Sequence, residues 1–128
     1  MAQLDPPNTI RSYKDLIAWQ EARRLVKAIY LVTKGFPSDE LYGLTQQIRR
    51  AAVSVPSNIA EGYGRGSRKE YVHFLQTARG SLYEVQTQLL LAEDLGYLPL
   101  EAQPELHSQA ERCSKLLHGL LRRLADAQ

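Results

Sequence analysis

The fold is decided by residues 71–92, which read YVHFLQTARGSLYEVQTQLLLA. Apolar side chains recur in this stretch at alternating steps of four and three, namely Tyr71, Leu75, Ala78, Leu82, Val85, Leu89 and Ala92. A seam of this kind, kept for three heptads, is typical of helices that pack lengthwise against one another. The capping-box pair Ser67 and Glu70 predicts where the helix begins. Gly96 and Pro99 predict where it ends.

The segments on either side of this helix show the same period. The pattern predicts helices over residues 12–33 and 38–61 and a fourth helix that begins within residues 100–105. Ser12 and Ser38 are the expected N-caps of the first two. The expected core-facing positions of these three helices are Leu16, Trp19, Ala22, Val26 and Ile29, then Leu41, Leu44, Ile48, Ala51, Val55, Ile59 and Gly62, and finally Leu106, Ala110, Cys113, Leu117, Leu120 and Leu124.

The four helices account for almost the whole chain of 128 residues. No segment alternates with the period of two that marks a strand, so the fold class is all-α. Short turns between helices of similar length predict an up-down-up-down antiparallel four-helix bundle. We expect one domain over residues 12–127, preceded by a mobile tail over residues 1–11.

Composition narrows the cellular setting. The single cysteine, Cys113, excludes an internal disulfide and suits a reducing compartment. No apolar run approaches the roughly 20 residues that a membrane span needs, and the N-terminus lacks the pattern of a signal peptide. A cytoplasmic protein with no membrane partner is therefore expected.

Positive charge is concentrated in the middle of the chain. Residues 41–80 hold six Arg or Lys against two Glu, whereas the formal net charge of the whole chain is +2. The candidates for binding nucleic acid or another anion are Arg49, Arg50, Arg65, Arg68 and Lys69. Such residues would bind phosphates with salt-dependent and largely sequence-independent affinity, and Tyr63 and Tyr71 could supply stacking faces. The alternative is that these residues form a solvated surface or pair with Glu61 and with the acidic fourth helix.

A second polar set lies around Pro56, which interrupts the apolar pattern of the second helix. Asn58 and Glu61 are expected to bond the backbone near the proline or to pair with an arginine such as Arg50 or Arg79. We interpret Asn58, Glu61 and Arg79 as a structural or interface set rather than a catalytic one.

Catalytic patterns are scarce. Glu70-x-x-His73 has the spacing found in di-iron bundles, but the chain holds no second Glu-x-x-His motif, and Glu70 is explained by capping. Cys113 lies on the apolar seam of the fourth helix, where a buried and inert thiol is expected. The sequence therefore predicts no catalytic residue, no metal and no cofactor.

Several motifs resemble those of one protein family, the bacterial four-helix-bundle proteins of the 23S rRNA intervening-sequence (S23) group. The resemblance runs from about residue 12 to residue 98. It rests on Trp19-Gln20, Tyr42-Gly43-Leu44-Thr45, Gln47-Ile48-Arg49-Arg50-Ala51, Pro56-Ser57-Asn58-Ile59-Ala60-Glu61-Gly62, Phe74-Leu75, Ala78-Arg79-Gly80-Ser81 and Leu95-Gly96-Tyr97.

This resemblance implies a four-helix bundle that assembles into a homopentamer and whose cellular role is mostly uncharacterised. It also implies a relation to the accessory protein of diversity-generating retroelements, which is similar to a basic pentameric barrel that binds nucleic acid and a reverse transcriptase. Two functional hypotheses follow. One is a non-enzymatic oligomer that binds RNA or DNA through a basic surface. The alternative is an assembly scaffold in which the arginine-rich central run forms the subunit interface.

Overall fold

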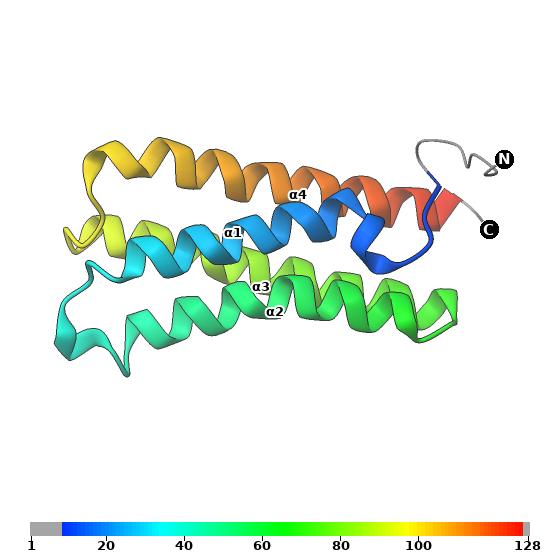
Figure 1. The fold of residues 1–128 in the computed structure, drawn as a ribbon, viewed down its shortest axis with the longest axis horizontal. Helices are drawn as coiled ribbons and strands as arrows, with labels where there is room; N and C mark the ends of the chain where they lie inside the picture. The colour runs from blue at the N-terminus through cyan, green and yellow to red at the C-terminus, as the bar shows by residue number, and fades with distance from the viewer. Residues whose placement is uncertain (1–8, 127–128) are drawn as a thin grey trace, which may run out of the picture.

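The computed structural model describes residues 9–126, and within them every regular element is helical. The four long helices are α1 (Ile17–Thr33), α2 (Leu44–Gly64), α3 (Arg68–Asp94) and α4 (Gln103–Asp126). Short 3₁₀ helices precede α1, α2 and α4, at Tyr13–Asp15, Ser38–Glu40 and Leu100–Ala102. Figure 1 shows the four helices running alternately in opposite directions and packed side by side. The predicted all-α, antiparallel four-helix bundle is confirmed.

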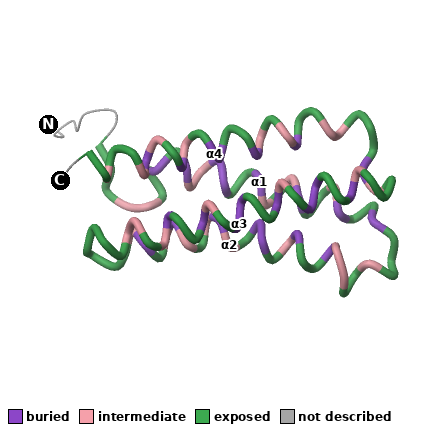
Figure 2. Tube along the Cα trace, turned by 180° about the vertical axis from the view of Figure 1, so that it is seen from behind, coloured by how far each residue is buried: buried purple, intermediate pink, exposed green. Residues whose placement is uncertain are grey.

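Each helix packs against its neighbours in the chain, and α4 closes the ring by packing against α1. The buried residues lie along the inward side of every helix (Figure 2). The largest side chains that are fully buried in this core are Leu25, Ile29, Ile48, Val55, Ile59, Leu75, Leu82, Val85, Leu89, Cys113 and Leu117. Burying one leucine or isoleucine contributes about 1.5–3 kcal/mol, so this shared core is the main source of stability.

The start of α1 differs from the prediction by one short element. The capping box at Ser12 is present: Ser12 Oγ accepts a hydrogen bond from the Lys14 amide at 3.1 Å, and Asp15 Oδ2 accepts one from the Ser12 amide at 3.2 Å. This box begins a 3₁₀ turn rather than α1 itself. Leu16 is extended, with φ −73° and ψ 125°, so the α-helix starts afresh at Ile17.

The predicted start of the second helix at Ser38 is wrong. Ser38 opens a 3₁₀ turn and makes no side-chain cap, and α2 begins six residues later at Leu44. The cap comes from Glu40, whose Oε1 accepts the Leu44 amide at 3.0 Å while its Oε2 accepts the Tyr97 hydroxyl at 2.9 Å. Leu41 therefore lies outside the helix and is 48% exposed rather than facing the core.

The region around Pro56 remains helical, and α2 runs through it without a break. Asn58 Nδ2 donates to the Ser54 carbonyl and to Ser54 Oγ, both at 2.8 Å. Ser54 Oγ in turn lies 2.8 Å from Ser81 Oγ on α3. Asn58 thus supports the backbone near the proline, and the two serines join α2 to α3.

Two glycines set the turn between α2 and α3. Gly66 has φ +83°, a conformation that favours glycine, and it directly precedes the Ser67 cap of α3. Gly62 lies at a close approach of the two helices, since a Cβ built there would be 2.7 Å from the Phe74 Cβ. Ser67 Oγ accepts the Glu70 amide at 3.2 Å, which is one half of the predicted capping box. The Glu70 carboxylate does not complete the box within the described residues and lies 4.0 Å from Arg65.

The predicted tail and domain boundary lie partly outside the described residues. Residues 1–8 of the expected tail and residue 127 of the expected domain belong to the undescribed ends. Residues 9–11 are exposed and non-helical. None of the helices within residues 9–126 is both long and apolar enough to cross a bilayer.

Candidate functional site: a basic groove between α3 and α4

An open groove of about 790 Å³ runs between the first half of α3 and the second half of α4. It is lined from α3 by Arg68, Lys69, Val72, Gln76 and Arg79, and from α4 by His118, Leu121, Arg122 and Ala125. These residues follow one another at steps of one, three or four on each helix, so each set occupies one helix face. The two faces meet at the antiparallel contact of α3 with α4.

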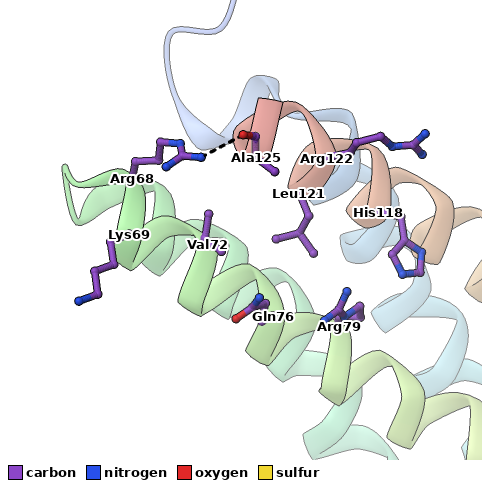
Figure 3. Close-up of a pocket in the computed structure, with 9 residues that line it drawn as sticks. All are labelled: Arg68, Lys69, Val72, Gln76, Arg79, His118, Leu121, Arg122 and Ala125. Atoms are coloured by element: carbon purple, nitrogen blue, oxygen red, sulfur yellow. Dashed lines mark hydrogen bonds between the residues drawn. The ribbon is translucent and has the colours of Figure 1, made fainter. Parts of the chain in front are cut away.

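The floor of the groove is apolar and its borders are basic. Val72 and Leu121 project towards each other from the two helices (Figure 3). Arg79 and His118 lie towards each other further along the groove, while Lys69 and Arg122 extend outwards at its rims (Figure 3). An anionic ligand with an apolar side would find both of its requirements met here.

Arg68 lies at the end of the groove that is next to the turn between α2 and α3. Its Nε donates to the Leu124 carbonyl at 2.6 Å, and its Nη2 donates to the same carbonyl and, at 3.5 Å, to that of Ala125. The last carbonyls of a helix lack intrahelical partners and carry the negative end of the helix dipole. Arg68 therefore caps α4 from α3 and fixes the relative position of the two walls.

The groove carries an unbalanced positive charge. Its lining holds four side chains that are cationic at neutral pH, Arg68, Lys69, Arg79 and Arg122, together with His118. Among the lining residues, all of which belong to the described part of the chain, none is Asp or Glu. Neighbouring cations without carboxylates raise the local positive potential, and such a groove attracts anions.

Arg49 and Arg50, the first two anion-binding candidates, lie away from this groove. Arg49 is half-buried and contacts the C-terminal end of α1. Its Nε donates to Thr33 Oγ1 at 2.8 Å, and its Nη2 donates to the Tyr30 carbonyl at 3.4 Å. Its guanidinium also lies 4.6 Å from the centre of the Tyr30 ring. Its contacts thus tie α1 to α2. Arg50 is exposed and borders a different hollow, between α2 and α3.

Arg65, a further candidate, is held by local contacts. Its guanidinium pairs with Glu61 at 2.9 Å, lies 4.0 Å from Glu70, and sits 5.0 Å from the centre of the Phe74 ring. Glu61 is exposed and pairs with Arg65 one turn away, which is the ion-pairing alternative for this arginine. An exposed pair of this kind contributes little to stability. Within residues 9–126, the other expected partners of Glu61, Arg50 and Arg79, make no ion pair with it.

The hollow between α2 and α3 has a volume of about 370 Å³ and is polar. It is lined by Gln47, Arg50, Ala51, Ser54, Ser81, Glu84 and Gln88. The Oε1 atom of Gln88 is buried and makes no hydrogen bond to the residues described. This side chain is 9% exposed, so the unpaired amide oxygen is an unusual feature of the α2–α3 face.

The two tyrosines expected to offer stacking faces do not border the groove. Tyr63 and Tyr71 pack edge to face on each other, with ring centres 5.9 Å apart. Burial raises the pKa of the Tyr71 hydroxyl to about 12, and that hydroxyl has no hydrogen-bond partner among the described residues. Their rings are therefore committed to packing.

Cys113 is buried in the core, as the sequence predicts. Burial raises the pKa of its thiol to about 12, and the nearby Glu21 carboxylate contributes to the rise. His73, of the Glu-x-x-His motif, is exposed and lies against Phe74. Residues 9–126 contain no cluster of three or more His, Cys, Asp or Glu side chains suited to a metal ion.

The α4 wall of the groove was not found from sequence. Residues 118, 121, 122 and 125 follow steps of three and one, which places them on one helix face beside the core seam. This spacing is the only sequence signal that groups these four residues. It does not identify a groove, because the sequence does not show which face of α3 lies opposite them.

A family model described as 23S rRNA-intervening sequence protein matches residues 14–119. The chain belongs to this family. Among solved structures, the fold is similar to that of a protein of unknown function from the S23 ribosomal protein family of Bacteroides thetaiotaomicron VPI-5482. The two superpose with a TM-score of 0.74 at 20% sequence identity, and the match covers 83% of this chain and 96% of that one. At this identity the similarity demonstrates the shared fold. No curated protein matches the chain.

Proposed function

We propose that this protein is a non-enzymatic, homo-oligomeric bundle that binds nucleic acid through the groove between α3 and α4. The observation that supports the proposal is the charge of the groove: four cationic side chains and His118 line it, and no carboxylate among the described lining residues offsets them.

Phosphate binding explains this arrangement better than a structural role does. Arg68 has a structural task at the end of α4, but Lys69, Arg79 and Arg122 have no ion-pair partner within residues 9–126. Cations that border a groove and are not neutralised by the fold are available to a polyanion. Binding of this kind releases counterions and is largely independent of sequence.

Assembly would strengthen the binding of nucleic acid. In the proposed homopentamer, five copies of the groove would act on one nucleic-acid chain, and linked sites bind far more tightly than a single one. A chain with a net charge of only +2 could then bind a polyanion firmly, because the relevant charge is local to the groove.

The test is a fluorescence-anisotropy titration of labelled RNA and DNA oligonucleotides at low salt. The double variant Arg79→Gln/Arg122→Gln removes two groove charges. The control Lys27→Gln/Lys34→Gln removes two exposed charges outside the groove, one within α1 and one at the residue that follows it. We expect the first variant to weaken binding at least tenfold and the second to leave it nearly unchanged. Equal effects of the two variants, or no binding by the unaltered protein, would refute the proposal.

A specific observation also favours the assembly-scaffold alternative. The α2–α3 face carries the hollow beside Arg50 and the unpaired Gln88 oxygen, and Val53 on the same helix as Arg50 is 39% exposed. The polar hollow, bordered by the exposed Arg50, is a surface that a second copy could cover, so this face suits a subunit interface. Replacing Arg50 with Glu should then reduce the oligomer mass measured by light scattering, and an unchanged mass would argue against this interface.

A further inference from the structure

Tyr83 lies on α3 one helical turn beyond Arg79, next to the groove between α3 and α4. The Tyr83 hydroxyl lies 3.4 Å from Nε2 of His118, which lines the groove from α4. Although this contact holds its tip, Tyr83 is 46% exposed. An exposed aromatic ring is thus placed beside a basic groove, and its hydroxyl contacts the α4 wall.

Single exposed aromatic rings are common and usually need no explanation. Tyr83 differs because its hydroxyl contacts His118, a residue of the groove wall. Proteins that bind single-stranded nucleic acid combine a positively charged groove, which follows the backbone, with aromatic faces on which bases stack. Here Arg79 and His118 supply the first element and Tyr83, directly beside them, supplies the second.

The exposed ring of Tyr83 favours a single strand over a duplex. Bases stack on aromatic rings through their faces, and a duplex keeps those faces stacked on one another while presenting base edges and phosphates at its surface. A single strand leaves its base faces free for Tyr83 and for the apolar floor at Val72 and Leu121.

We propose that the groove binds single-stranded nucleic acid, with phosphates along the basic walls and one base stacked on the ring of Tyr83. This inference rests on the proposed nucleic-acid function and specifies the form of the ligand. Because stacking and phosphate contacts are shared by RNA and DNA, both single strands are expected to bind.

The test compares Tyr83→Leu, which removes the ring, with Tyr83→Phe, which keeps the ring and removes only the hydroxyl. Tyr42→Leu is the matched control, since Tyr42 is 85% exposed and lies outside the groove. The probes are labelled 12-nucleotide single strands of oligo-uridine and oligo-thymidine, a 12-base-pair duplex, and a poly-glutamate peptide. Circular dichroism verifies that each variant is folded.

We expect Tyr83→Leu to weaken the binding of both single strands by about 5- to 150-fold, the range for one lost base stack. Tyr83→Phe and Tyr42→Leu should bind like the unaltered protein, and the duplex should bind more weakly and respond to none of these changes. Equal losses in Tyr83→Leu and Tyr83→Phe, or no loss in Tyr83→Leu, would overturn the stacking role of Tyr83.

The outcomes also separate this inference from the function on which it rests. Salt-dependent binding of the duplex at least as tight as that of the single strands would overturn the single-strand inference and leave nucleic-acid binding intact. Binding of neither form at low salt, or binding of poly-glutamate in their place, would overturn both.

Discussion

Replacing Gly62 with alanine should destabilise the bundle, because α2 and α3 meet at this residue. A Cβ there would lie 2.7 Å from the Phe74 Cβ, 3.2 Å from the Tyr71 carbonyl oxygen and 3.3 Å from the Tyr71 Cδ1. A Cβ atom is fixed to the backbone and cannot turn aside as the end of a long side chain can. The backbone of α3 would therefore have to move.

The expected size of the effect follows from two opposed contributions. Overpacking of a tight contact costs about 1–3 kcal/mol. Alanine is the better helix former by about 1 kcal/mol in a helix interior, and by less at position 62 because α2 ends two residues later. The net loss should be about 1–2 kcal/mol, which lowers the melting temperature by roughly 3–8 °C in a domain of this size.

Gly80→Ala is the matched control. Gly80 lies inside α3, is exposed, and has no atom within 4 Å of the position that a Cβ would take. Alanine should stabilise the protein there by about 0.5–1 kcal/mol. Urea unfolding followed by circular dichroism measures both variants. If Gly62→Ala proves as stabilising as Gly80→Ala, the close approach of α2 and α3 at this turn is wrong.

Three further predictions concern single groups. Tyr71→Phe removes a buried hydroxyl that has no hydrogen-bond partner among the described residues, so it should raise the free energy of unfolding by about 1 kcal/mol. Between about pH 10 and 12 the folded state retains the Tyr71 proton that the unfolded state releases, so the variant should also lose less stability over this range. Urea titrations at several pH values measure both effects. Cys113, whose pKa burial raises to about 12, should resist a maleimide reagent at pH 8 in the folded protein and react once guanidinium unfolds it, so rapid labelling of the folded state would contradict its burial. The pKa of Glu40 is lowered by its hydrogen bond from the Leu44 amide and, to a smaller extent, by that from the Tyr97 hydroxyl. Tyr97→Phe should therefore raise the Glu40 pKa part of the way towards 4.5 in an NMR titration, and an unchanged pKa would argue against the Tyr97 bond. The stability that Glu40 contributes is present above pH 4.5 and is lost as the pH falls through its lowered pKa.

The sequence predicted the bundle because helical periodicity is a local signal that recurs in every helix. It failed at Ser38 for a physical reason. Serine and the two acidic residues after it favour a helix start, but the chain forms only a 3₁₀ turn there, and Glu40 caps α2 from four residues away. Capping from that distance depends on the path of the loop, which residue preferences do not encode. The same loop leaves Leu41 in solvent.

The candidate site was predicted only in part. The clustering of basic residues along residues 41–80 points to Arg68 and Lys69, whereas the sequence predicts a structural role for Arg79, which borders the groove. The sequence does not single out Arg122 or Tyr83, because neither belongs to a motif. Their significance arises only when α4 packs antiparallel to α3, and the register of two helices is a tertiary property. Charge clustering along the chain therefore located one wall of the groove and missed the other.

The measurement that tests the central claim most directly is the salt dependence of single-strand binding. If Lys69, Arg79 and Arg122, the three groove cations without a structural task, each contact one phosphate, the logarithm of the association constant should fall against the logarithm of the salt concentration with a slope of about −2.1 per protomer engaged. The Arg79→Gln/Arg122→Gln variant keeps one of the three, so its slope should be about −0.7. A slope near zero, or one that the two substitutions leave unchanged, would contradict the assignment of this groove as the nucleic-acid site.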